Sequence, residues 1–530
     1  MATVADHIVQ SLCDAGVRAL FGVPGGGSNL DLIAAAGRAG LPFVLTATET
    51  AGAMSAIAQA EITGAPGACL TTLGPGATSV VNGIACAFLE RAPLVVFTDS
   101  LPASAPYAHQ RVDHGALLKP VTKSSETLTV ERACDAITRA LHTATDGQPG
   151  PVHLDCPGNV ASAPAPTVGF GSNAGIVTTH TPVSRLEAVF AAAHRPLLLV
   201  GLGAIRGRED LRVADLCAQH RVPAMVTYTA KGVIPDDHAW FAGIFTNAKI
   251  EQPLIDQSDL LIGVGLDPVE LIPRAWTRKQ PIVYFGSWRA DDDHIPFDVQ
   301  VIGAHHETVT LLDSLVGRTE WDPSAVARDV QRQRDLVARA DDTGFTAQRV
   351  IEIAAKKLVT VGARVTVDAG AHMFPATVLW PVGAPRTMLI SNGLSTMGFA
   401  LPAAIGAALL DRERPVIALT GDGGLLMCMG ELLTAAREQL PIVTIVFADD
   451  SLSLIEIKQQ ARKLPPFGVA LGGIDWQAIA RGFGIRGFGA TNGCELERAI
   501  DAARESRAPA LIEARIDRSN YGETMRAIRG

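Results

Sequence analysis

The chain has 530 residues, of which 48% are hydrophobic and 19% are charged. At roughly 150 residues per domain, this length predicts three or four domains, and the apolar fraction excludes a disordered or fibrous chain. Its 45 basic and 54 acidic residues give a net charge of −9, so the chain lacks the basic field that sequence-independent nucleic-acid binding or attachment to an anionic membrane needs. We therefore expect a small-molecule partner, and neither a nucleic acid nor a membrane.

The cysteines and the apolar runs bear on the compartment. The eight cysteines are scattered, with no Cys-x-x-Cys pair and no Cys/His cluster at metal-ligand spacing, so we expect free thiols in a reducing compartment. No Lys or Arg precedes Arg18, which argues against a secretory signal. The longest apolar run, residues 396–410, contains Pro402 and is shorter than the roughly 18 residues of a membrane span. These features predict a cytoplasmic protein.

Short runs of leucine and β-branched residues alternate along the chain with alanine-rich stretches of helical period. This alternation predicts βαβ units with parallel sheets buried on both faces. The alternation stops at residues 161–182 and at the polar stretch 318–346. We expect both segments to be linkers, although the second has a helical pattern of its own. We therefore predict an α/β fold of three doubly wound parallel-sheet domains, at about residues 1–160, 183–317 and 345–525. The strands expected from these runs include residues 93–97, 196–200, 260–264, 281–285, 415–419 and 442–447.

An internal repeat connects the first and third predicted domains. Residues 69–100 and 417–451 share the order strand, glycine turn, helix, proline, strand and acidic end. Any two βαβ units share part of this order, so chance similarity stays open as one explanation. The other is that the two domains are related and face each other across one site.

The residues Gly421-Asp422-Gly423-Gly424 follow one expected strand and open a helix. Glycine there lets the backbone approach a phosphate, and a helix N-terminus offers free N–H groups, although an ordinary tight turn would explain the same residues. Asp449 and Asp450 end the next strand, with 25 residues between Gly423 and Asp449. Adjacent parallel strands would bring these carboxylates to one edge of the sheet, where open α/β sheets bind ligands. Two carboxylates beside a phosphate suit Mg²⁺.

The GDG turn, this spacing and the acidic pair resemble the signature of the thiamine diphosphate (ThDP) enzyme superfamily, and the similarity covers essentially the whole chain. The resemblance implies a pyrimidine-binding domain, a central Rossmann-like domain and a diphosphate-binding domain, in that order. It implies that Asp422, the Asp450 side chain and the Leu452 backbone carbonyl bind Mg²⁺, with Leu452 also beside the cofactor. The family usually has Asn-Asn where this chain has Asp449-Asp450, so the chain adds negative charge next to the diphosphate.

Glu49 is the strongest catalytic candidate. The segment TETAGA, residues 48–53, resembles the family's catalytic glutamate segment, in which the carboxylate hydrogen-bonds N1′ of the aminopyrimidine so that the C2 proton of the thiazolium can be removed. An isolated glutamate is usually a solvated surface charge. Here it precedes the run AGAMSAIAQA, residues 51–60, which is so poor in charge that we predict a buried helix.

Further residues are assigned to the cofactor by the same resemblance. Gly421, Gly423 and Gly424 would cradle the diphosphate. Met397, in the segment STMGFALP, would be the bulky apolar residue that folds the cofactor into a V, although a core methionine filling a gap explains it too. Gly370 and His372 follow the first strand of the third domain, where His372 would meet the diphosphate or have a structural role.

Two segments bear on which reaction occurs. His109-Gln110 resembles the acetohydroxyacid synthase region whose glutamine lines the active site, and the preceding histidine is similar to the catabolic acetolactate synthases. The segment SLIE, residues 453–456, resembles the pyruvate decarboxylase segment whose glutamate assists proton transfer, which makes Glu456 a catalytic candidate. An exposed carboxylate at a helix start explains Glu456 equally well.

The resemblance implies a ThDP- and Mg²⁺-dependent lyase or transferase that decarboxylates a 2-oxo acid. It would pass the enamine carbanion to an aldehyde or a second 2-oxo acid, as acetolactate synthases do. A non-ligating decarboxylase, of the benzoylformate or pyruvate decarboxylase type, is the alternative. The resemblance also implies a homodimer or homotetramer whose active sites are shared between chains.

A third interpretation, from a different class, is a nucleotide-binding oxidoreductase built on the central domain. Gly201-Leu202-Gly203 follows a strand there, but the acidic ribose ligand expected after the next strand is missing. We therefore expect no FAD.

Overall fold

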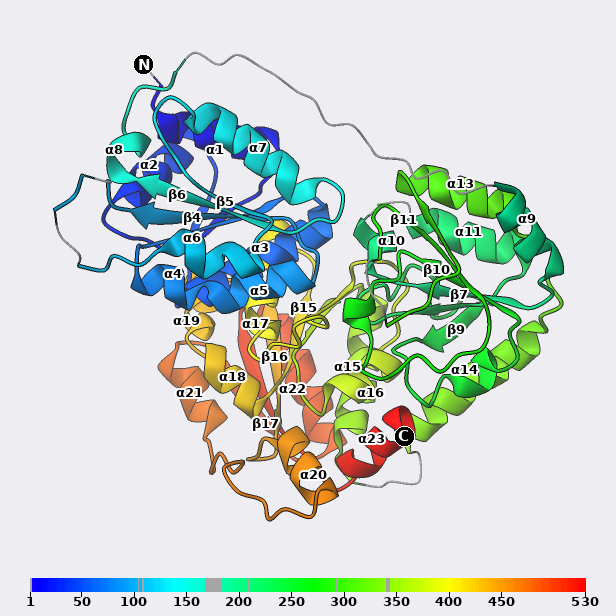
Figure 1. The fold of residues 1–530 in the computed structure, drawn as a ribbon. Coiled ribbons are helices and arrows are strands. Elements are labelled where there is room, and N and C mark those ends of the chain that lie inside the picture. The colour runs from blue at the N-terminus through cyan, green and yellow to red at the C-terminus, as the bar shows by residue number, and fades with distance from the viewer. Residues whose placement is uncertain are drawn as a thin grey trace.

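The computed structural model describes residues 2–102, 104–106, 109–166, 183–206, 210–290, 294–339 and 344–530. Three six-stranded sheets follow one another along the chain, all their strand pairs are parallel, and helices flank each sheet (Figure 1). The predicted fold of three doubly wound α/β domains is confirmed. Most of the linker expected at residues 161–182 lies outside the described residues.

The first sheet has the strand order β2-β1-β3-β4-β6-β5. Its two central strands, β3 and β4, are buried almost throughout, as apolar runs covered on both faces require. The strands are β1 (Leu20–Val23), β2 (Phe43–Leu45), β3 (Gly67–Thr71), β4 (Leu94–Ser100), β5 (Ser124–Thr127) and β6 (Pro151–Pro157). The helices are α1 (Val4–Asp14), α2 (Ser28–Ala39), α3 (Glu49–Thr63), α4 (Pro75–Ser79), α5 (Val81–Leu89), α6 (His114–Leu118), α7 (Ala133–Thr145) and α8 (Gly158–Ala161).

The central sheet has the order β12-β11-β10-β7-β8-β9, which is the doubly wound order of dinucleotide-binding folds. Its strands are β7 (Pro196–Val200), β8 (Ala224–Val226), β9 (Phe241–Ile244), β10 (Leu260–Val264), β11 (Ile282–Gly286) and β12 (Val299–Ile302). The helices are α9 (Val183–Ala192), α10 (Leu202–Arg206), α11 (Asp210–His220), α12 (Gln252–Ile255) and α13 (His305–Leu315). The polar stretch 318–346 contains a 16-residue helix, α14 (Pro323–Ala338), capped by the Asp322 side chain, which confirms its helical pattern.

The third sheet has the order β14-β13-β15-β16-β18-β17. Counted from its own first strand, this order is identical to that of the first sheet, and the two repeat segments occupy β3–β4 and β15–β16. The two domains therefore share one topology, which the central domain does not have. The strands are β13 (Arg364–Val367), β14 (Met388–Ile390), β15 (Val416–Gly421), β16 (Ile442–Ala448), β17 (Arg486–Ala490) and β18 (Ala510–Arg515). The helices are α15 (Ala347–Leu358), α16 (Met373–Leu379), α17 (Ala400–Leu410), α18 (Asp422–Cys428), α19 (Glu431–Arg437), α20 (Ser453–Ala461), α21 (Trp476–Gly482), α22 (Gly493–Ser506) and α23 (Tyr521–Arg529).

Helices α3 and α17 pack together and join the first domain to the third (Figure 1). Ser55 Oγ donates a hydrogen bond to the Pro402 carbonyl at 2.8 Å, and Gln59 Nε2 donates to the Gly406 carbonyl at 3.1 Å. A Cβ atom on Gly406 would lie 2.2 Å from the Ser55 carbonyl oxygen, so only glycine allows this close approach. Residues 51–61 of α3 are all buried, as the charge-poor run predicted.

The predictions made from the cysteines and the apolar runs can be compared with the structure. All eight cysteines are free thiols, in agreement with the absence of a disulfide pattern. In the described part of the chain, no helix combines the length and the apolar character that crossing a membrane would require.

Candidate active site

A cavity of about 370 Å³ lies where the strands of the third sheet end. Its wall includes residues 369–374, 421–424 and 451–455, together with Met397, Asp449 and Tyr521. Four segments that sequence analysis assigned to the cofactor therefore meet in one place. Three of them follow the strands β13, β15 and β16, and the fourth, with Met397, precedes α17. The parallel sheet therefore brings them together at its carboxyl edge.

Asp422 links the ends of two neighbouring strands. Its side chain is 3% exposed; Oδ2 accepts the N–H groups of Asp449 at 3.1 Å and Asp450 at 2.7 Å, and Oδ1 accepts the Gly423 N–H at 2.8 Å. Burial raises the pKa of this carboxyl group, while the backbone hydrogen bonds act in the opposite direction. The GDG turn and the acidic pair therefore lie side by side, as predicted from adjacent strands.

The two aspartates of the acidic pair have different partners. Asp449 accepts the Ser451 N–H at 3.1 Å and the Ser453 hydroxyl at 2.6 Å, and burial raises its pKa to about 6. Asp450 pairs through Oδ2 with Arg515 Nη1 at 2.9 Å, while its Oδ1 is buried and has no hydrogen-bond partner. Asp450 is therefore the member of the pair that retains an unused oxygen.

The Leu452 carbonyl lies at the start of α20. It accepts the N–H groups of Ile455 at 2.8 Å and Glu456 at 3.1 Å, so this oxygen is already engaged with the first turn of the helix.

At the glycines of the turn, neighbouring atoms occupy the space that a side chain would need. A Cβ atom on Gly423 would lie 2.6 Å from Leu452 Cδ2 and 3.2 Å from Met397 Cε, and one on Gly424 would lie 2.4 Å from Asp368 Oδ2. The turn is therefore enclosed by neighbouring side chains, with the Met397 methyl group over Gly423. Glycine at residues 423 and 424 is what allows these neighbours to pack so closely on the turn.

His372 is 2% exposed, and its ring stacks on Phe447 with 4.8 Å between the centroids. Burial lowers its pKa to about 4, so the imidazole is neutral at physiological pH. Its Nε2 is buried without a hydrogen-bond partner. A Cβ atom on Gly370 would lie 2.7 Å from His372 Cε1, so the glycine makes space for the ring.

These residues fit a diphosphate held through a divalent ion. Asp450 Oδ1 and His372 Nε2 are buried polar atoms with no protein partner, which native structures seldom leave unpaired. Within the described ranges, no cluster of three or more His, Cys, Asp and Glu side chains has metal-binding geometry. An ion here would therefore take its remaining ligands from phosphate oxygens and water, as Mg²⁺ commonly does.

Glu49 lies at the carboxyl edge of the first sheet and is absent from the wall of this cavity. It is the first residue of α3, and its Oε2 accepts the Ser79 hydroxyl at 2.7 Å. Glu431 Oε1 accepts the N–H groups of Ala47 at 2.9 Å and Thr48 at 3.2 Å. The backbone just before Glu49 is therefore held by α19 of the third domain. Sequence analysis missed this contact.

His109 and Gln110 lie in an exposed turn of the first domain. Gln110 has a φ of +58°, and a Cβ atom on Gly74 would lie 2.6 Å from the Gln110 carbonyl oxygen. Gly76, two residues further on, faces Glu49: a Cβ there would lie 3.1 Å from Glu49 Oε1. The turn after β3 thus lies between Gln110 and Glu49 at one sheet edge.

Glu456 does not line the cavity. Its Oε2 accepts the Ser451 hydroxyl and pairs with Arg518 Nη1, each at 2.8 Å. The side chain is 17% exposed, so this carboxylate is engaged with the loop and with the segment after β18.

Helix α23 contributes Tyr521 and Arg529 to the cavity wall, which sequence analysis did not predict. Tyr521 is 3% exposed, and the Arg529 guanidinium lies 4.6 Å from the centroid of the Phe374 ring. The available signal was the helical spacing of Tyr521, Thr524 and Ile528, the buried residues of this segment.

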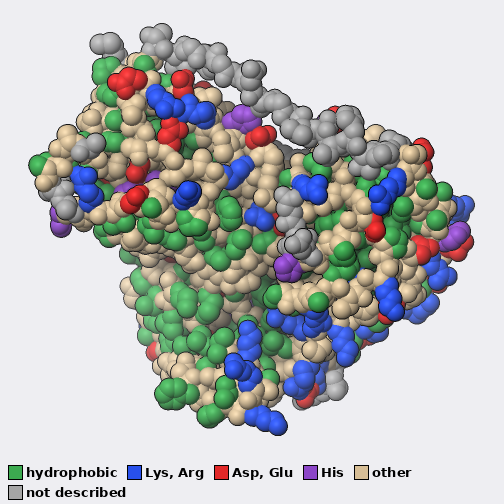
Figure 2. Space-filling model, viewed as in Figure 1, with side chains coloured by type: hydrophobic (Ala, Val, Ile, Leu, Met, Phe, Trp, Pro, Cys, Tyr) green, Lys and Arg blue, Asp and Glu red, His purple; other side chains and the backbone are tan. Residues whose placement is uncertain are grey.

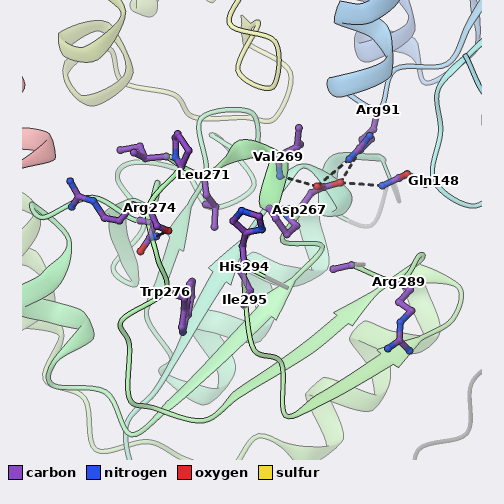
Figure 3. A pocket seen from close by; sticks show the side chains of 15 residues that line it. Arg91, Gln148, Asp267, Val269, Leu271, Arg274, Trp276, Arg289, His294 and Ile295 are labelled. Atoms are coloured by element: carbon purple, nitrogen blue, oxygen red, sulfur yellow. Dashed lines mark hydrogen bonds and ion pairs between the residues drawn. The ribbon is translucent and has the colours of Figure 1, made fainter. Parts of the chain in front are cut away.

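The central domain has a second cavity, of about 360 Å³. Figure 3 shows Arg91 of the first domain reaching Asp267 at its margin, an ion pair of 2.9 Å. The glycine turn of this domain lies elsewhere and is closely packed: a Cβ on Gly203 would lie 2.7 Å from Gly265 Cα. The Leu202 N–H, at the start of α10, donates to Glu270 Oε2 at 2.8 Å.

Three parallel-sheet domains, with a glycine cradle and two aspartates at one sheet edge, define an α/β protein that binds a phosphorylated ligand. The chain matches the models of the N-terminal TPP binding domain, the central domain and the C-terminal TPP binding domain of thiamine pyrophosphate enzymes, at residues 2–117, 183–312 and 368–514. Thiamine pyrophosphate is another name for ThDP.

Three relatives are similar to the chain over almost its whole length. The catabolic acetolactate synthase of Raoultella terrigena is 30% identical, covering 97% of this chain and 95% of the relative. The acetolactate synthase of Bacillus subtilis is 28% identical, covering 97% and 93%. A probable 2-ketoarginine decarboxylase of Pseudomonas aeruginosa is 28% identical, covering 97% and 94%.

The chain belongs to the thiamine pyrophosphate enzymes. It is an acetolactate synthase-like, ThDP-dependent enzyme that acts on carbon–carbon bonds, within a family of carboligases.

Proposed function

We propose that the protein decarboxylates a 2-oxo acid and joins the remaining fragment to a carbonyl acceptor, in a reaction that needs ThDP and Mg²⁺. The observation that carries this proposal is the cavity at the third sheet, where the unpartnered His372 Nε2 and the glycine turn 421–424 lie beside Asp422 and Asp450. The donor is a small 2-oxo acid, and the acceptor is an aldehyde or a second 2-oxo acid.

Each residue around the cavity has a defined task in this proposal. Asp422, Asp450 Oδ1 and the Leu452 carbonyl hold Mg²⁺, and the glycine turn with His372 holds the diphosphate. Met397 supports the cofactor from the side of Gly423. When bound, ThDP supplies the carbon nucleophile and the electron sink for decarboxylation. Glu49 holds and returns a proton at the aminopyrimidine ring.

The site requires two chains. None of the residues lining the cavity belongs to the first domain, so the Glu49 that serves it comes from another copy. Helices α18 and α19, next to the cavity, expose Leu426, Met427 and Leu433, and Figure 2 shows hydrophobic side chains gathered over this region below the first domain. We therefore propose a homodimer, or a homotetramer built from such dimers, with shared active sites.

Carboligation is favoured over simple decarboxylation by two residues. Gln110 lies at the edge that presents Glu49, and His109 precedes it, so both would face an acceptor. Glu456, the residue expected of a decarboxylase, pairs with Arg518 and does not line the cavity. The decarboxylase alternative is supported by the probable 2-ketoarginine decarboxylase among the relatives.

The third interpretation, a nucleotide-binding oxidoreductase, has less support. The Glu270 carboxylate is bonded at the start of α10, at the place where a dinucleotide phosphate would bind in this type of domain. We therefore propose that this turn binds no FAD or other dinucleotide. Eight free thiols fit a reducing compartment, and we place the enzyme in the cytoplasm.

The test is a product screen with the purified enzyme, ThDP and Mg²⁺. A panel of 2-oxo acids, including pyruvate and 2-ketoarginine, is supplied with and without an added aldehyde, and both CO₂ and carbon products are measured. We expect CO₂ release accompanied by a ligated hydroxyketone product. Release of CO₂ with only free aldehyde, under every acceptor condition, would establish the decarboxylase alternative.

A further inference from the structure

Arg515 is the counter-ion of Asp450, one of the two aspartates that depart from the family pattern. It is the last residue of β18 and is paired in register with Ala448, the last residue of β16. Its Nη1 donates to Asp450 Oδ2 at 2.9 Å, and its Nη2 donates to Glu513 Oε1 at 2.7 Å. The guanidinium group thus bridges two carboxylates, and one of them, Asp450, lies between the cavity-lining residues Asp449 and Ser451.

The three aspartates near the expected metal position differ in the groups that balance their negative charge. Asp422 is hydrogen-bonded to three backbone N–H groups, and Asp449 to a backbone N–H and a hydroxyl. Of these three aspartates, Asp450 has the ion pair with an arginine. An asparagine at position 450 would offer the same oxygen without a charge. Arg515 therefore balances the negative charge that an aspartate has and an asparagine lacks.

The ion pair with Arg515 also makes the two carboxylate oxygens of Asp450 different. Oδ2 is occupied by Arg515, whereas Oδ1 is buried and has no partner. The backbone at Asp450 has a φ of +59°, and its N–H donates to Asp422 Oδ2 at 2.7 Å. Both the main chain and one carboxylate oxygen are therefore held while the other oxygen remains available.

Building on the proposed function, we propose that Arg515 is a charge-balancing and positioning residue that makes the Asp450 carboxylate equivalent to a neutral metal ligand beside a diphosphate. Without Arg515, the negative charge of Asp450 would be uncompensated. That charge would attract a divalent cation more strongly and would repel the diphosphate. The two affinities should therefore change in opposite directions, whereas local damage to the site would weaken both.

The experiment compares wild type, Arg515→Gln, Asp450→Asn and the double variant in two binding measurements that need no turnover. Calorimetry with Mn²⁺ alone reports cation binding to the cofactor-free protein, and titration with ThDP at saturating Mg²⁺ reports cofactor binding. For Arg515→Gln we expect roughly fivefold tighter Mn²⁺ binding and roughly fivefold weaker ThDP binding, the upper range for partly exposed charges. In the double variant both affinities should return to within about twofold of wild type, because an uncharged amide at position 450 needs no counter-ion.

Arg507→Gln is the matched control. Arg507 lies just before β18 and pairs with Glu413 on the exposed surface, so its substitution removes the same charge at the opposite end of the strand from Arg515. Both affinities should stay at wild-type values. Weakening of both affinities in Arg515→Gln, no change in either, or failure of the added Asp450→Asn substitution to restore them would overturn the inference. If wild-type protein failed to bind ThDP with Mg²⁺, the proposed function itself would fail, which separates the two results.

Discussion

Both carboxylate oxygens of Asp368 lie within hydrogen-bonding distance of the Gly398 N–H, at 2.9 and 3.1 Å. Oδ1 also accepts the Phe399 N–H at 3.2 Å, and Oδ2 accepts the Thr420 hydroxyl at 2.7 Å. Asp368 is completely buried. One side chain therefore fixes the segment that presents Met397 to the strand that precedes the glycine turn.

Asp368→Asn should loosen this connection. The amide nitrogen would face the Gly398 N–H, which is itself a donor, and the remaining hydrogen bonds would lose their charged acceptor. We therefore expect a loss of about 2 kcal/mol in the free energy of unfolding and faster loss of ThDP on dilution. Denaturant unfolding and cofactor retention after gel filtration measure the two effects. Asp135→Asn, at an exposed site on α7, is the control and should change stability by less than about 0.5 kcal/mol; equal stability of the two variants would contradict the assignment.

Glu49→Gln should retain ThDP but lose C2 proton exchange, because an amide cannot hold the proton at the aminopyrimidine ring as a carboxylate does. The expected loss is about 10² to 10⁴ in exchange rate, measured by deuterium incorporation in cofactor-saturated protein. Ser79→Ala removes only the hydrogen bond to Glu49 and should have a much smaller effect. Near wild-type exchange in Glu49→Gln would refute the assignment of Glu49.

Asp422→Ala should abolish ThDP retention at low Mg²⁺. The substitution removes a proposed metal ligand and leaves the N–H groups of Asp449 and Asp450 without their acceptor. Asp422→Asn, with its oxygen in the Oδ2 position, still accepts both of these N–H groups and loses only the bond from the Gly423 N–H. It should therefore retain more cofactor at high Mg²⁺ than Asp422→Ala does. Titration of Mg²⁺ at fixed ThDP checks this order, and equal retention in both variants would show that the loop does not depend on this oxygen.

Mixing Glu49→Gln chains with Asp422→Ala chains tests the shared site. In a hybrid dimer, one site contains both substitutions and the other contains neither, so activity should reappear at up to roughly half the wild-type value per hybrid. Hybrids isolated with two different affinity tags give this measurement, with each parent dimer as the baseline. Inactive hybrids made from folded parents would mean that each site is built within one chain.

The unfolding free energy should depend on pH through Glu90, at the junction of the three domains. Its Oε1 accepts the Gly393 N–H at 2.8 Å, and Arg206 of the central domain donates to the Glu90 carbonyl at 2.7 Å. Burial first, and then the nearby Glu61 charge, raise the pKa of the Glu90 carboxyl from 4.5 to about 8. The folded protein therefore keeps a proton that the unfolded chain loses.

The contribution of Glu90 to the free energy of unfolding is complete below about pH 4.5. It is lost as the pH rises towards about 8, by at most about 1.4 kcal/mol per pH unit. Glu90→Gln cannot ionise and should flatten this decline. Urea unfolding of both proteins from about pH 5 to about pH 8 measures the difference. Parallel stability curves would show that Glu90 does not change its protonation on unfolding.

The sequence was sufficient for the strands and for the convergence of the cofactor motifs. Strands such as Ile442–Ala448 are buried along their whole length, so their apolar runs identify them without further information. The meeting of Asp422 with Asp450 follows from the parallel order of β15 and β16. Both conclusions depend on local pattern and on general rules of sheet geometry.

The contacts that sequence analysis missed are made between segments far apart in the chain. Glu431 binds the backbone before Glu49 from 383 and 384 residues away, and Glu456 meets Arg518 62 residues later. No periodicity records such pairings, because they depend on how the domains and loops pack. The same holds for Arg515, whose partner could be recognised only once β16 and β18 were seen to be neighbours.

The turn after β3 is the first-domain counterpart of the turn after β15, but two of its residues, Gly74 and Pro75, offer an anion no free N–H group. Pro75 has no N–H group, and the Gly74 N–H donates to His114 Nε2 at 3.1 Å. Gly76 faces the Glu49 carboxylate, which would repel an anion. We therefore expect one cofactor per chain, with the first copy of the turn next to the Glu49 carboxylate and the second copy serving the diphosphate.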